Sequence, residues 1–404
     1  MKKPVAIKPA GSLIATVCLL LSLLLTTARV GVACSWDYPI WMIRSKTADP
    51  LYRFIKNGKA GYIDRSGKIV IEPKFEFLGN HGGEFHDGLL DISFDDAGYA
   101  DTSGKVVISK KFAFAEDFSE GLAVARLKDT DAWSYIDRTG EVALVPRLDD
   151  QTDFQLESFS DGLALVRVNN KWGYIDHSGR LVIPPKFLWA SDFHEGMAWV
   201  ITEGPCSFFE DGHCSFSPRV IGKEMQGEVS ACKFLFIDKS GAVGGKGYEA
   251  VKDFSEGLAP VLEGDKWGFI DKKGSMVIEP KFDGAEPFSD GMARVKLGDS
   301  WGYIDRTGAL VIGFQYELAD DFVDGLAPVG RWDDEGEDGE FYYIDKRGIQ
   351  AIPEKFAQAS HFFKGLAHVK LRPNKKQKEG DPEIFAYINQ GGKKVFTYKV
   401  VPED

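Results

Sequence analysis

The chain has 404 residues, of which 44% are hydrophobic and 27% are charged, and this composition is typical of a globular protein. Its formal net charge of −12 argues against nucleic acid as a partner, because nucleic-acid binders carry basic surfaces. Only one stretch approaches the length and hydropathy of a membrane span, so the sequence excludes a polytopic membrane protein.

The first segment, residues 1–33, has the pattern of a secretory signal peptide. Three lysines precede the apolar run Leu13–Leu25, and the small residues Gly31–Ala33 come directly before Cys34. We therefore expect cleavage before Cys34, a secreted or periplasmic location, and no transmembrane domain in the remaining chain. A retained N-terminal anchor is one alternative, although the run is shorter than the ~20 residues of a span. A lipid anchor at Cys34 is another, although glycine stands where a lipoprotein signal usually has leucine.

Cysteine usage agrees with export. Four cysteines remain after that cleavage, and in an oxidising compartment an even number predicts one or two disulfides. The disulfide candidates are Cys34, Cys206, Cys214 and Cys232. A zinc site that includes His213 is the alternative, but the paired cysteine spacing of structural zinc sites is absent. The sequence predicts no metal and no cofactor.

Three short blocks recur along the chain. An aromatic residue followed by Ile-Asp-x-x-Gly occurs nine times, counting two degenerate copies. A second block, Phe-Ser-(Glu/Asp)-Gly-(Leu/Met)-Ala, lies between successive copies, and a third, Val-Ile-x-Pro-Lys-Phe, follows the turn. The nine copies begin at Tyr62, Tyr99, Tyr135, Tyr174, Phe236, Phe269, Tyr303, Tyr343 and Tyr387. Self-similarity at a near-constant period indicates supersecondary units that stack on one another.

In three copies a Trp-Gly pair directly precedes the aromatic residue, within Lys171–Asp176, Lys266–Asp271 and Trp301–Asp305. These copies resemble the bacterial WG repeat, and the resemblance extends over residues 52–400. It implies a repeat protein with a binding role and specifies no activity. Other copies depart from the pattern, with Ser134 in place of the glycine and with Ala60, Ala97, Phe234, Phe341 and Phe385 in place of the tryptophan. These substitutions argue against the Trp-Gly pair as a ligand site.

The copy Gly291–Phe322 shows how one unit should fold. Alternating apolar and basic residues predict a half-exposed strand, a second strand surrounds Trp301, and Asp305–Gly308 is typical of a tight turn. Each unit contains three antiparallel strands and a short return, and because one meander is too small to be stable, the units must stack.

We predict an all-β tandem array of about nine three-stranded units, organised as a signal (1–33), a lead-in (34–51) and the array (52–400). Nine exceeds the usual four to eight blades of a propeller, so an open or spiral superhelix is favoured. A closed propeller-like ring, or two sub-rings, is the alternative.

The three longest insertions fall in one connection of the unit, between the first two predicted strands. They are residues 201–233, 331–340 and 371–383. Insertions in repeat proteins project from one edge, which is often the binding edge. The acidic loop 331–340 offers oxygen ligands for calcium, but the order of EF-hand ligands is absent and a solvated charged loop is the favoured interpretation.

Catalytic motifs are absent: the sequence contains no nucleophile elbow, zinc-protease motif or phosphate-binding loop. The aspartates of the repeated turns could act as acids, but their fixed position before a glycine favours capping of the turn. They are Asp64, Asp137, Asp176, Asp238, Asp271, Asp305 and Asp345. The seven histidines show no ligand spacing, and most are expected at the surface or in turns.

We therefore predict an exported, non-enzymatic scaffold that binds another protein through the variable loops of one edge. The alternative is a carbohydrate-binding or carbohydrate-cleaving protein of the cell envelope. Exposed rows of the repeated Trp and Tyr rings, which we expect to be mostly core, with a carboxylate pair nearby among the 61 acidic residues would favour it. A spacer that holds a partner away from the membrane is a third hypothesis.

Overall fold

The computed structural model describes residues 50–76, 83–92, 97–148, 154–202, 233–332, 339–373 and 381–401. Contacts divide the chain into Met1–Met42 and Ile43–Asp404, and all described residues belong to the second unit. These residues form antiparallel β-sheets and contain no α-helix, so the all-β prediction is confirmed. Within the described ranges, accordingly, there is no helix with the length and hydropathy of a membrane span.

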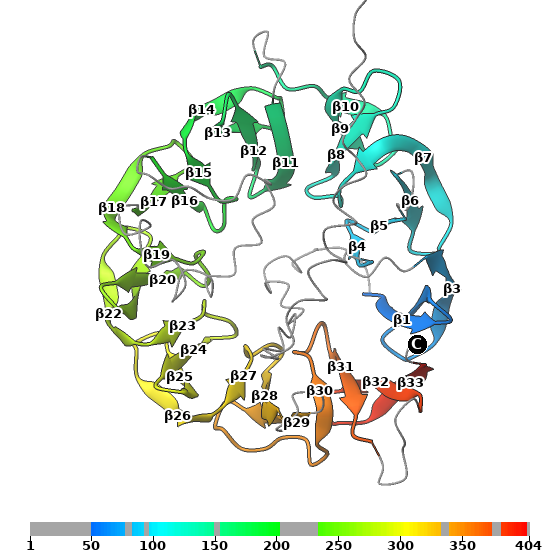
Figure 1. Cartoon of the computed structure of the whole chain (residues 1–404), viewed down its shortest axis with the longest axis vertical. Helices are drawn as coiled ribbons and strands as arrows, with labels where there is room; N and C mark the ends of the chain where they lie inside the picture. The colour runs from blue at the N-terminus through cyan, green and yellow to red at the C-terminus, as the bar shows by residue number, and fades with distance from the viewer. Residues whose placement is uncertain are drawn as a thin grey trace, which may run out of the picture. The chain divides into compact units, whose positions relative to one another are not determined.

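The sheets of residues 43–404 are blades that follow one another around a ring (Figure 1). The first three blades contain β1 (Tyr52–Lys56), β2 (Lys59–Ile63), β3 (Ile69–Glu76), β4 (Phe85–His86), β5 (Leu89–Asp91), β6 (Ala97–Asp101), β7 (Val106–Ala115), β8 (Leu122–Leu127), β9 (Trp133–Asp137) and β10 (Val142–Leu144). The next two contain β11 (Phe154–Ser160), β12 (Leu163–Val168), β13 (Lys171–Asp176), β14 (Leu181–Phe187), β15 (Trp189–Ala190), β16 (Met197–Ile201), β17 (Phe234–Asp238) and β18 (Val243–Tyr248).

Four further blades complete the ring. Blades 6 and 7 contain β19 (Ala250–Val251), β20 (Leu258–Glu263), β21 (Lys266–Asp271), β22 (Met276–Phe282), β23 (Gly284–Ala285), β24 (Met292–Leu297), β25 (Ser300–Asp305) and β26 (Leu310–Tyr316). Blades 8 and 9 contain β27 (Leu318–Ala319), β28 (Leu326–Trp332), β29 (Gly339–Asp345), β30 (Phe356–Ala359), β31 (Leu366–Leu371), β32 (Glu383–Asn389) and β33 (Lys394–Val400). The described residues thus contain nine blades, one for each predicted copy.

Blades 4 to 7 each form a separate sheet of four strands rather than the three predicted. The additional strand in blades 5 to 7 is the innermost and has only two residues, as in Trp189–Ala190. Two residues are too few to show the alternation by which a strand is recognised in a sequence. Strands β7 and β30 each pair with two neighbouring blades, which joins blades 2 and 3, and blades 8 and 9, into seven-stranded sheets.

The hydrophobic core lies between successive blades. One buried cluster, for example, combines Trp172, Tyr174 and Ile183 of blade 4 with Phe193 and Val200 of blade 5. The phenylalanine that opens each Phe-Ser-Glu-Gly block packs against the aromatic residue of the preceding copy, with ring centroids 4.7 Å apart in this pair of blades. A blade therefore completes its core only against its neighbours, as the sequence predicts.

The array closes into a ring, so the ring alternative is correct and the favoured open superhelix is wrong. Tyr52 and Phe54 of blade 1 share a buried cluster with Leu366 and Tyr387 of blade 9. The Tyr52 hydroxyl donates to the carbonyl of Phe363 at 3.1 Å, and the Tyr387 hydroxyl donates to the carbonyl of Arg53 at 2.6 Å. Closure is favoured because it buries the apolar faces that the two end blades of an open array would expose.

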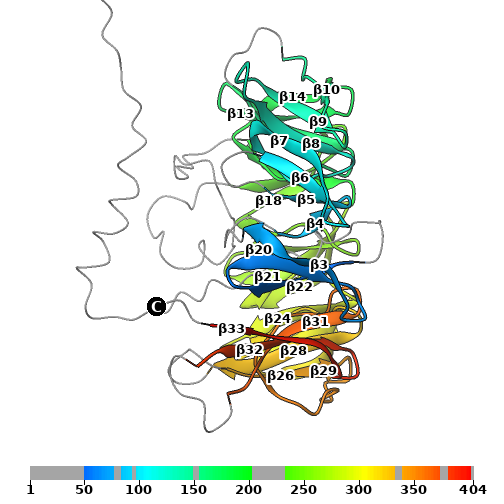
Figure 2. The ribbon, with the colours of Figure 1, turned by 90° about the vertical axis from the view of Figure 1, so that its right-hand side faces the viewer.

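The antiparallel strand order gives the ring two different faces. Turns between the first and second strands, such as 194–196, and between the third and fourth strands, such as 239–241, lie on one face, which we call the turn face. Connections between the second and third strands, such as 264–265 and 298–299, lie on the opposite face, which we call the loop face. Figure 2 shows the ring from the side, with its strands running between these faces.

Candidate functional site

The repeated aspartates cap the turns of the turn face. The Asp176 carboxylate accepts hydrogen bonds from the backbone N–H groups of Ser178 at 2.9 Å and Arg180 at 3.2 Å. The Ser178 hydroxyl also donates to Asp176, and these hydrogen bonds lower the pKa of that carboxyl to about 2. The predicted capping role is confirmed.

A second set of carboxylates links each blade to the next across the turn face. Asp290 accepts the backbone N–H of Gly325 at 2.6 Å and pairs with Lys346 at 3.1 Å, both in the following blade. The same bond to a glycine N–H joins Asp87 to Gly121, Glu120 to Gly162, Asp161 to Gly196, Glu195 to Gly257, Glu256 to Gly291 and Asp324 to Gly365. The turn face is therefore occupied by contacts that hold the blades together.

Hydroxyl groups add further bonds between blades. The Tyr303 hydroxyl donates to the carbonyl of Asp320 at 2.8 Å, and the Ser289 hydroxyl donates to the carbonyl of Phe322 at 2.7 Å. The Tyr174 and Tyr343 hydroxyls make the same bond to Ser191 and Ser360. Burial raises the pKa of these tyrosines, so the hydroxyls stay protonated and able to donate.

The Trp-Gly pairs belong to the structural core. Trp172, Trp267 and Trp301 are each less than a tenth exposed. The paired glycine allows close approach of the fourth strand, because a Cβ at Gly173 would lie 2.5 Å from the carbonyl oxygen of Ile183. Where Ser134 replaces the glycine, the adjoining strand β10 has only three residues. The described tryptophans of these pairs thus form no exposed row for stacking on sugars.

The connections that vary most in length begin and end at strand ends on the loop face. The segment 203–232 joins β16 to β17, 333–338 joins β28 to β29, and 374–380 joins β31 to β32. All three occupy the connection between the second and third strands of their blades. The disulfide candidates Cys34, Cys206, Cys214 and Cys232 and most of the acidic loop 331–340 lie outside the described residues.

A cluster of acidic side chains that sequence reasoning missed lies at the inner ends of the blades. Its members, which we call the inner-rim carboxylates, are Glu116, Glu157, Asp192 and Asp253. Glu157 lies within the innermost strand of its blade, and the other three follow an innermost strand by one or two residues. Each stands one or two residues before the buried phenylalanine of a Phe-Ser-Glu-Gly block. The signal was present in the sequence, as an acid one or two positions before that phenylalanine in almost every copy.

Burial dominates the electrostatics of the inner-rim carboxylates. Desolvation raises the pKa of Asp192 to about 6 and, together with the neighbouring Asp192 charge, raises the pKa of Asp253 to about 7. Desolvation and the nearby Asp117 and Asp192 raise the pKa of Glu116 to about 7, despite the hydrogen bond from Ser158. Desolvation and Glu116 raise the pKa of Glu157 to about 8. Near neutral pH this cluster therefore holds protons that carboxyl groups in water have lost.

From blade 6 to blade 9 the inner rim also carries basic groups beside its acids. Lys252 contacts Glu286 at 2.6 Å, and Arg294 contacts Asp321 at 2.9 Å. His361 lies 3.5 Å from Asp320, and the hydrogen bond from His361 helps to hold the pKa of Asp320 at about 2 against the effect of burial. Asp321 nevertheless resembles the inner-rim carboxylates, because burial raises the pKa of Asp321 to about 7 despite the nearby Arg294 guanidinium.

One histidine differs from the expectation of surface or turn positions. His368 lies within strand β31, is stacked on Phe385 and shares a hydrogen bond with the Tyr398 hydroxyl at 2.9 Å. His194 lies in the turn 194–196, as expected, and is buried there. Burial lowers the pKa of His368 to about 4. This packing could not be predicted from the sequence, because Phe385 and Tyr398 come from strands other than that of His368.

A family model described as the WG containing repeat matches the chain seven times. The matches cover residues 61–95, 98–130, 133–172, 172–204, 236–267, 267–300 and 301–330. Blade 9 and most of blade 8 follow the last match, although their folds and contacts repeat those of the other blades. No curated protein matches the chain in sequence.

Solved structures support the propeller-like fold. The crystal structure of a eukaryotic initiation factor has 11% sequence identity and a TM-score of 0.56, over 88% of this chain and 97% of its own. KlHsv2 with loop 6CD replaced by a Gly-Ser linker has 10% identity and a TM-score of 0.34, over 65% of this chain and 96% of its own. The first likeness concerns the fold alone, and the second is too distant to support an inference.

Proposed function

This chain belongs to the WG repeat family, and we propose that it is an exported, non-enzymatic scaffold that binds another protein through its loop face. Export rests on the signal pattern of residues 1–33. The binding role rests on the position of the connections whose lengths differ between blades.

One observation carries the proposal: the three long insertions occupy the same connection in three different blades. The connections after β16, β28 and β31 all lie on the loop face. Equivalent connections in blades 6 and 7 have only two residues, 264–265 and 298–299. Long loops on a rigid scaffold are a common location for binding sites.

The turn face, in contrast, is occupied by contacts between blades. Its turns bind one another through carboxylates such as Asp290 and hydroxyls such as that of Ser289. A partner seated there would compete with contacts that hold the ring together. The loop-face connections differ in length from blade to blade, which favours that face as the recognition surface.

The proposal is tested by capturing partners from envelope and culture extracts with two matched baits. In the first, residues 203–232 are replaced by a two-residue turn like that at 264–265. In the second, Lys346→Gln and Arg347→Gln change the turn face instead. We expect a partner that the unaltered chain and the turn-face variant retain and the loop-trimmed variant loses. Equal retention of the same partner by all three would contradict the proposal.

A carbohydrate-cleaving protein is the second candidate, and the inner-rim carboxylates favour it. Glycoside hydrolysis needs a protonated and an ionised carboxyl group, and Glu157 and Glu116 have raised pKa values of about 8 and about 7. Hydrolysis of envelope polysaccharide by the unaltered chain, abolished in Glu157→Gln, would support this candidate. Equal hydrolysis by the Glu157→Gln variant, or none by either protein, would contradict it.

A further inference from the structure

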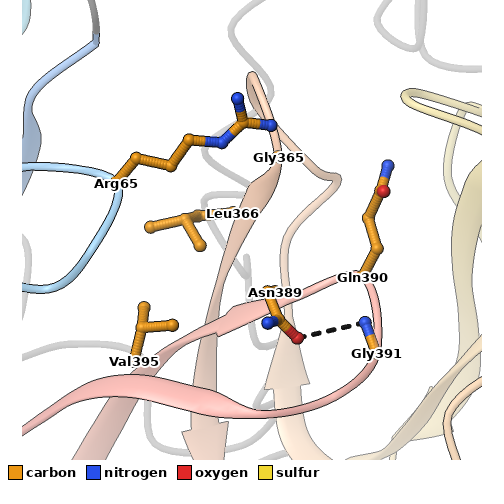
Figure 3. Close-up of a pocket in the computed structure, with 7 residues that line it drawn as sticks. All are labelled: Arg65, Gly365, Leu366, Asn389, Gln390, Gly391 and Val395. Atoms are coloured by element: carbon orange, nitrogen blue, oxygen red, sulfur yellow. Dashed lines mark hydrogen bonds between the residues drawn. The ribbon is translucent and has the colours of Figure 1, made fainter.

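The junction between blade 9 and blade 1, where the ring closes, contains a pocket of about 360 Å³. Arg65 extends into it from the turn between β2 and β3, and Leu366 and Val395 form its apolar wall (Figure 3). The turn between β32 and β33 supplies Asn389 and Gln390. We call this the seam pocket. None of its seven lining residues is acidic, in a chain with a net charge of −12.

The charges at this junction differ from those at four others. In blades 3, 4, 5 and 7 the third residue of the Phe-Ser-Glu-Gly block is an acid. It contacts the basic residue that directly follows the Ile-Asp pair of the next blade. These pairs are Glu120–His177, Asp161–Lys239, Glu195–Lys272 and Asp290–Lys346. In blade 9 the acid is replaced by Lys364, while the base of blade 1 is Arg65. The junction thus brings two cations together where others have an ion pair.

Arg65 occupies the place of the paired base but has no acidic partner among the described residues. Its guanidinium lies against Gly365, so closely that a side chain at that position would overlap it. Every carboxylate that pairs with the equivalent base elsewhere comes from the residue that is Lys364 here. The guanidinium therefore keeps hydrogen-bond donors for an oxyanion.

A second substitution removes another negative charge from the same pocket. The turn aspartate of the other copies is Asn389 in blade 9. Its side-chain oxygen still accepts the backbone N–H groups of Gly391 at 3.1 Å and Lys393 at 3.0 Å. The turn is therefore capped as in the other blades, and the amide nitrogen of Asn389 remains a donor at the pocket wall.

We propose that the seam pocket binds a small organic carboxylate, with the carboxylate on Arg65 and Asn389 and a short apolar group against Leu366 and Val395. A guanidinium and an amide are the donors that recognise a planar carboxylate, and the apolar wall distinguishes an organic acid from an inorganic anion. The same chemistry is offered by a free carboxylic acid and by the carboxyl terminus of a peptide.

The test uses isothermal titration of the full chain with four probes. N-acetyl-leucine carries the carboxylate, N-acetyl-leucinamide lacks it, inorganic phosphate lacks the apolar group, and the peptide Ala-Ala-Leu presents a carboxyl terminus. We expect N-acetyl-leucine to bind and its amide to show no saturable binding. Tighter binding of Ala-Ala-Leu would assign the pocket to peptide termini, and equal or weaker binding would assign it to free acids.

Three variants locate the site, and two of them restore residues that the other copies have. Arg65→Gln removes the guanidinium, Lys364→Glu supplies the missing acid for Arg65, and Asn389→Asp keeps the turn cap while adding a negative charge. Each should weaken binding of N-acetyl-leucine at least ~10-fold, because charge-assisted hydrogen bonds are lost. Lys364→Glu should also raise the melting temperature. The control Lys346→Gln, at the junction of blades 7 and 8, should leave binding unchanged.

Several outcomes would overturn the proposal. They are no saturable binding of N-acetyl-leucine by the unaltered chain, equal binding of its amide, or unchanged affinity in Arg65→Gln. Equal affinity for inorganic phosphate would overturn the assignment to an organic acid. A Lys364→Glu variant that is more stable and still binds with full affinity would show that the pocket recognises its ligand without Arg65.

Discussion

The turn face and the loop face lie at opposite ends of the same strands. Contacts between blades constrain the residues of the turn face, whereas the connections of the loop face differ in length. On the turn face, carboxylates such as Asp290 bond to a glycine N–H and a lysine of the next blade, and the pattern repeats around the ring. On the loop face, the equivalent connection is two residues long in blade 7 and spans the segment 203–232 in blade 5. A repeat protein can therefore hold its ring together on one face and vary on the other.

The largest expected difference concerns buried and exposed hydrophobic residues near the two faces. Phe322→Ala removes a fully buried ring at the turn face and should cost ~3–5 kcal/mol of the free energy of unfolding. Leu297→Ala, at the loop-face end of β24, removes a side chain that is 47% exposed and should cost less than ~0.5 kcal/mol. Denaturant unfolding of both variants measures the difference. Equal costs would mean that the loop face also holds the ring together.

Two glycines with positive φ give a sharper comparison. Gly298→Ala on the loop face (φ 61°) should cost ~1–2 kcal/mol from backbone strain alone, because its Cβ would meet no atom within 4 Å. Gly308→Ala on the turn face (φ 82°) should cost more, because its Cβ would lie 3.0 Å from Ile278 of the preceding blade. The melting temperatures of the two variants measure these costs. A larger fall for Gly298→Ala than for Gly308→Ala would contradict the expectation.

A single hydroxyl should have a smaller effect. Tyr303→Phe leaves the carbonyl of Asp320 without its donor and should cost ~1 kcal/mol. Tyr248→Phe, at the loop-face end of β18, is the matched control, because no described residue bonds to that hydroxyl, and it should cost less than ~0.5 kcal/mol. Chemical denaturation of the pair provides the measurement. A neutral Tyr303→Phe would show that the bonds between blades contribute little.

The smallest expected effect is a change in pH dependence. The inner-rim carboxylates have folded-state pKa values of about 6 to about 8, above the unfolded value near 4, so the folded state binds more protons and stability should fall as pH rises through that range. Asp192→Asn should make this fall shallower. On the loop face, Asp283→Asn should not, since hydrogen bonds from Lys266 and Gly298 lower the pKa of Asp283.

Melting temperatures at pH 5.5, 7 and 8.5 test this dependence for the unaltered chain and both variants. The lowered pKa of His368, about 4, acts in the opposite direction only below about pH 6.5. A melting temperature of the unaltered chain that rises between pH 7 and 8.5 would contradict the burial of the carboxylates.

Local features of the fold followed from the sequence, because each copy repeats the same local chemistry. The turn around Asp305 and Gly308 and the strand around Trp301 could be placed from turn residues and alternation alone. The two-residue innermost strands could not, since Gly284–Ala285 carries no period that marks a strand. Closure was predicted only as the alternative to an open superhelix, because it depends on Tyr52 meeting Phe363 across the whole length of the array.

The candidate sites were less accessible to sequence reasoning. The insertion pattern identified the connection that carries the variable loops, because it needed only the spacing between motifs. The inner-rim carboxylates and the seam pocket depend on which blades become neighbours. Lys364 and Asn389 are visible as departures from the repeat, but their proximity to Arg65 exists only after the ring closes.

The most direct test of a recognition surface on the loop face is hydrogen exchange of the full chain with and without its captured partner. We predict slower exchange in the connections 203–232, 264–265 and 298–299, with the turns 271–274 and 305–308 unchanged. Protection confined to those turns, with the loop connections unaffected, would contradict the account and move the binding site to the face that holds the ring together.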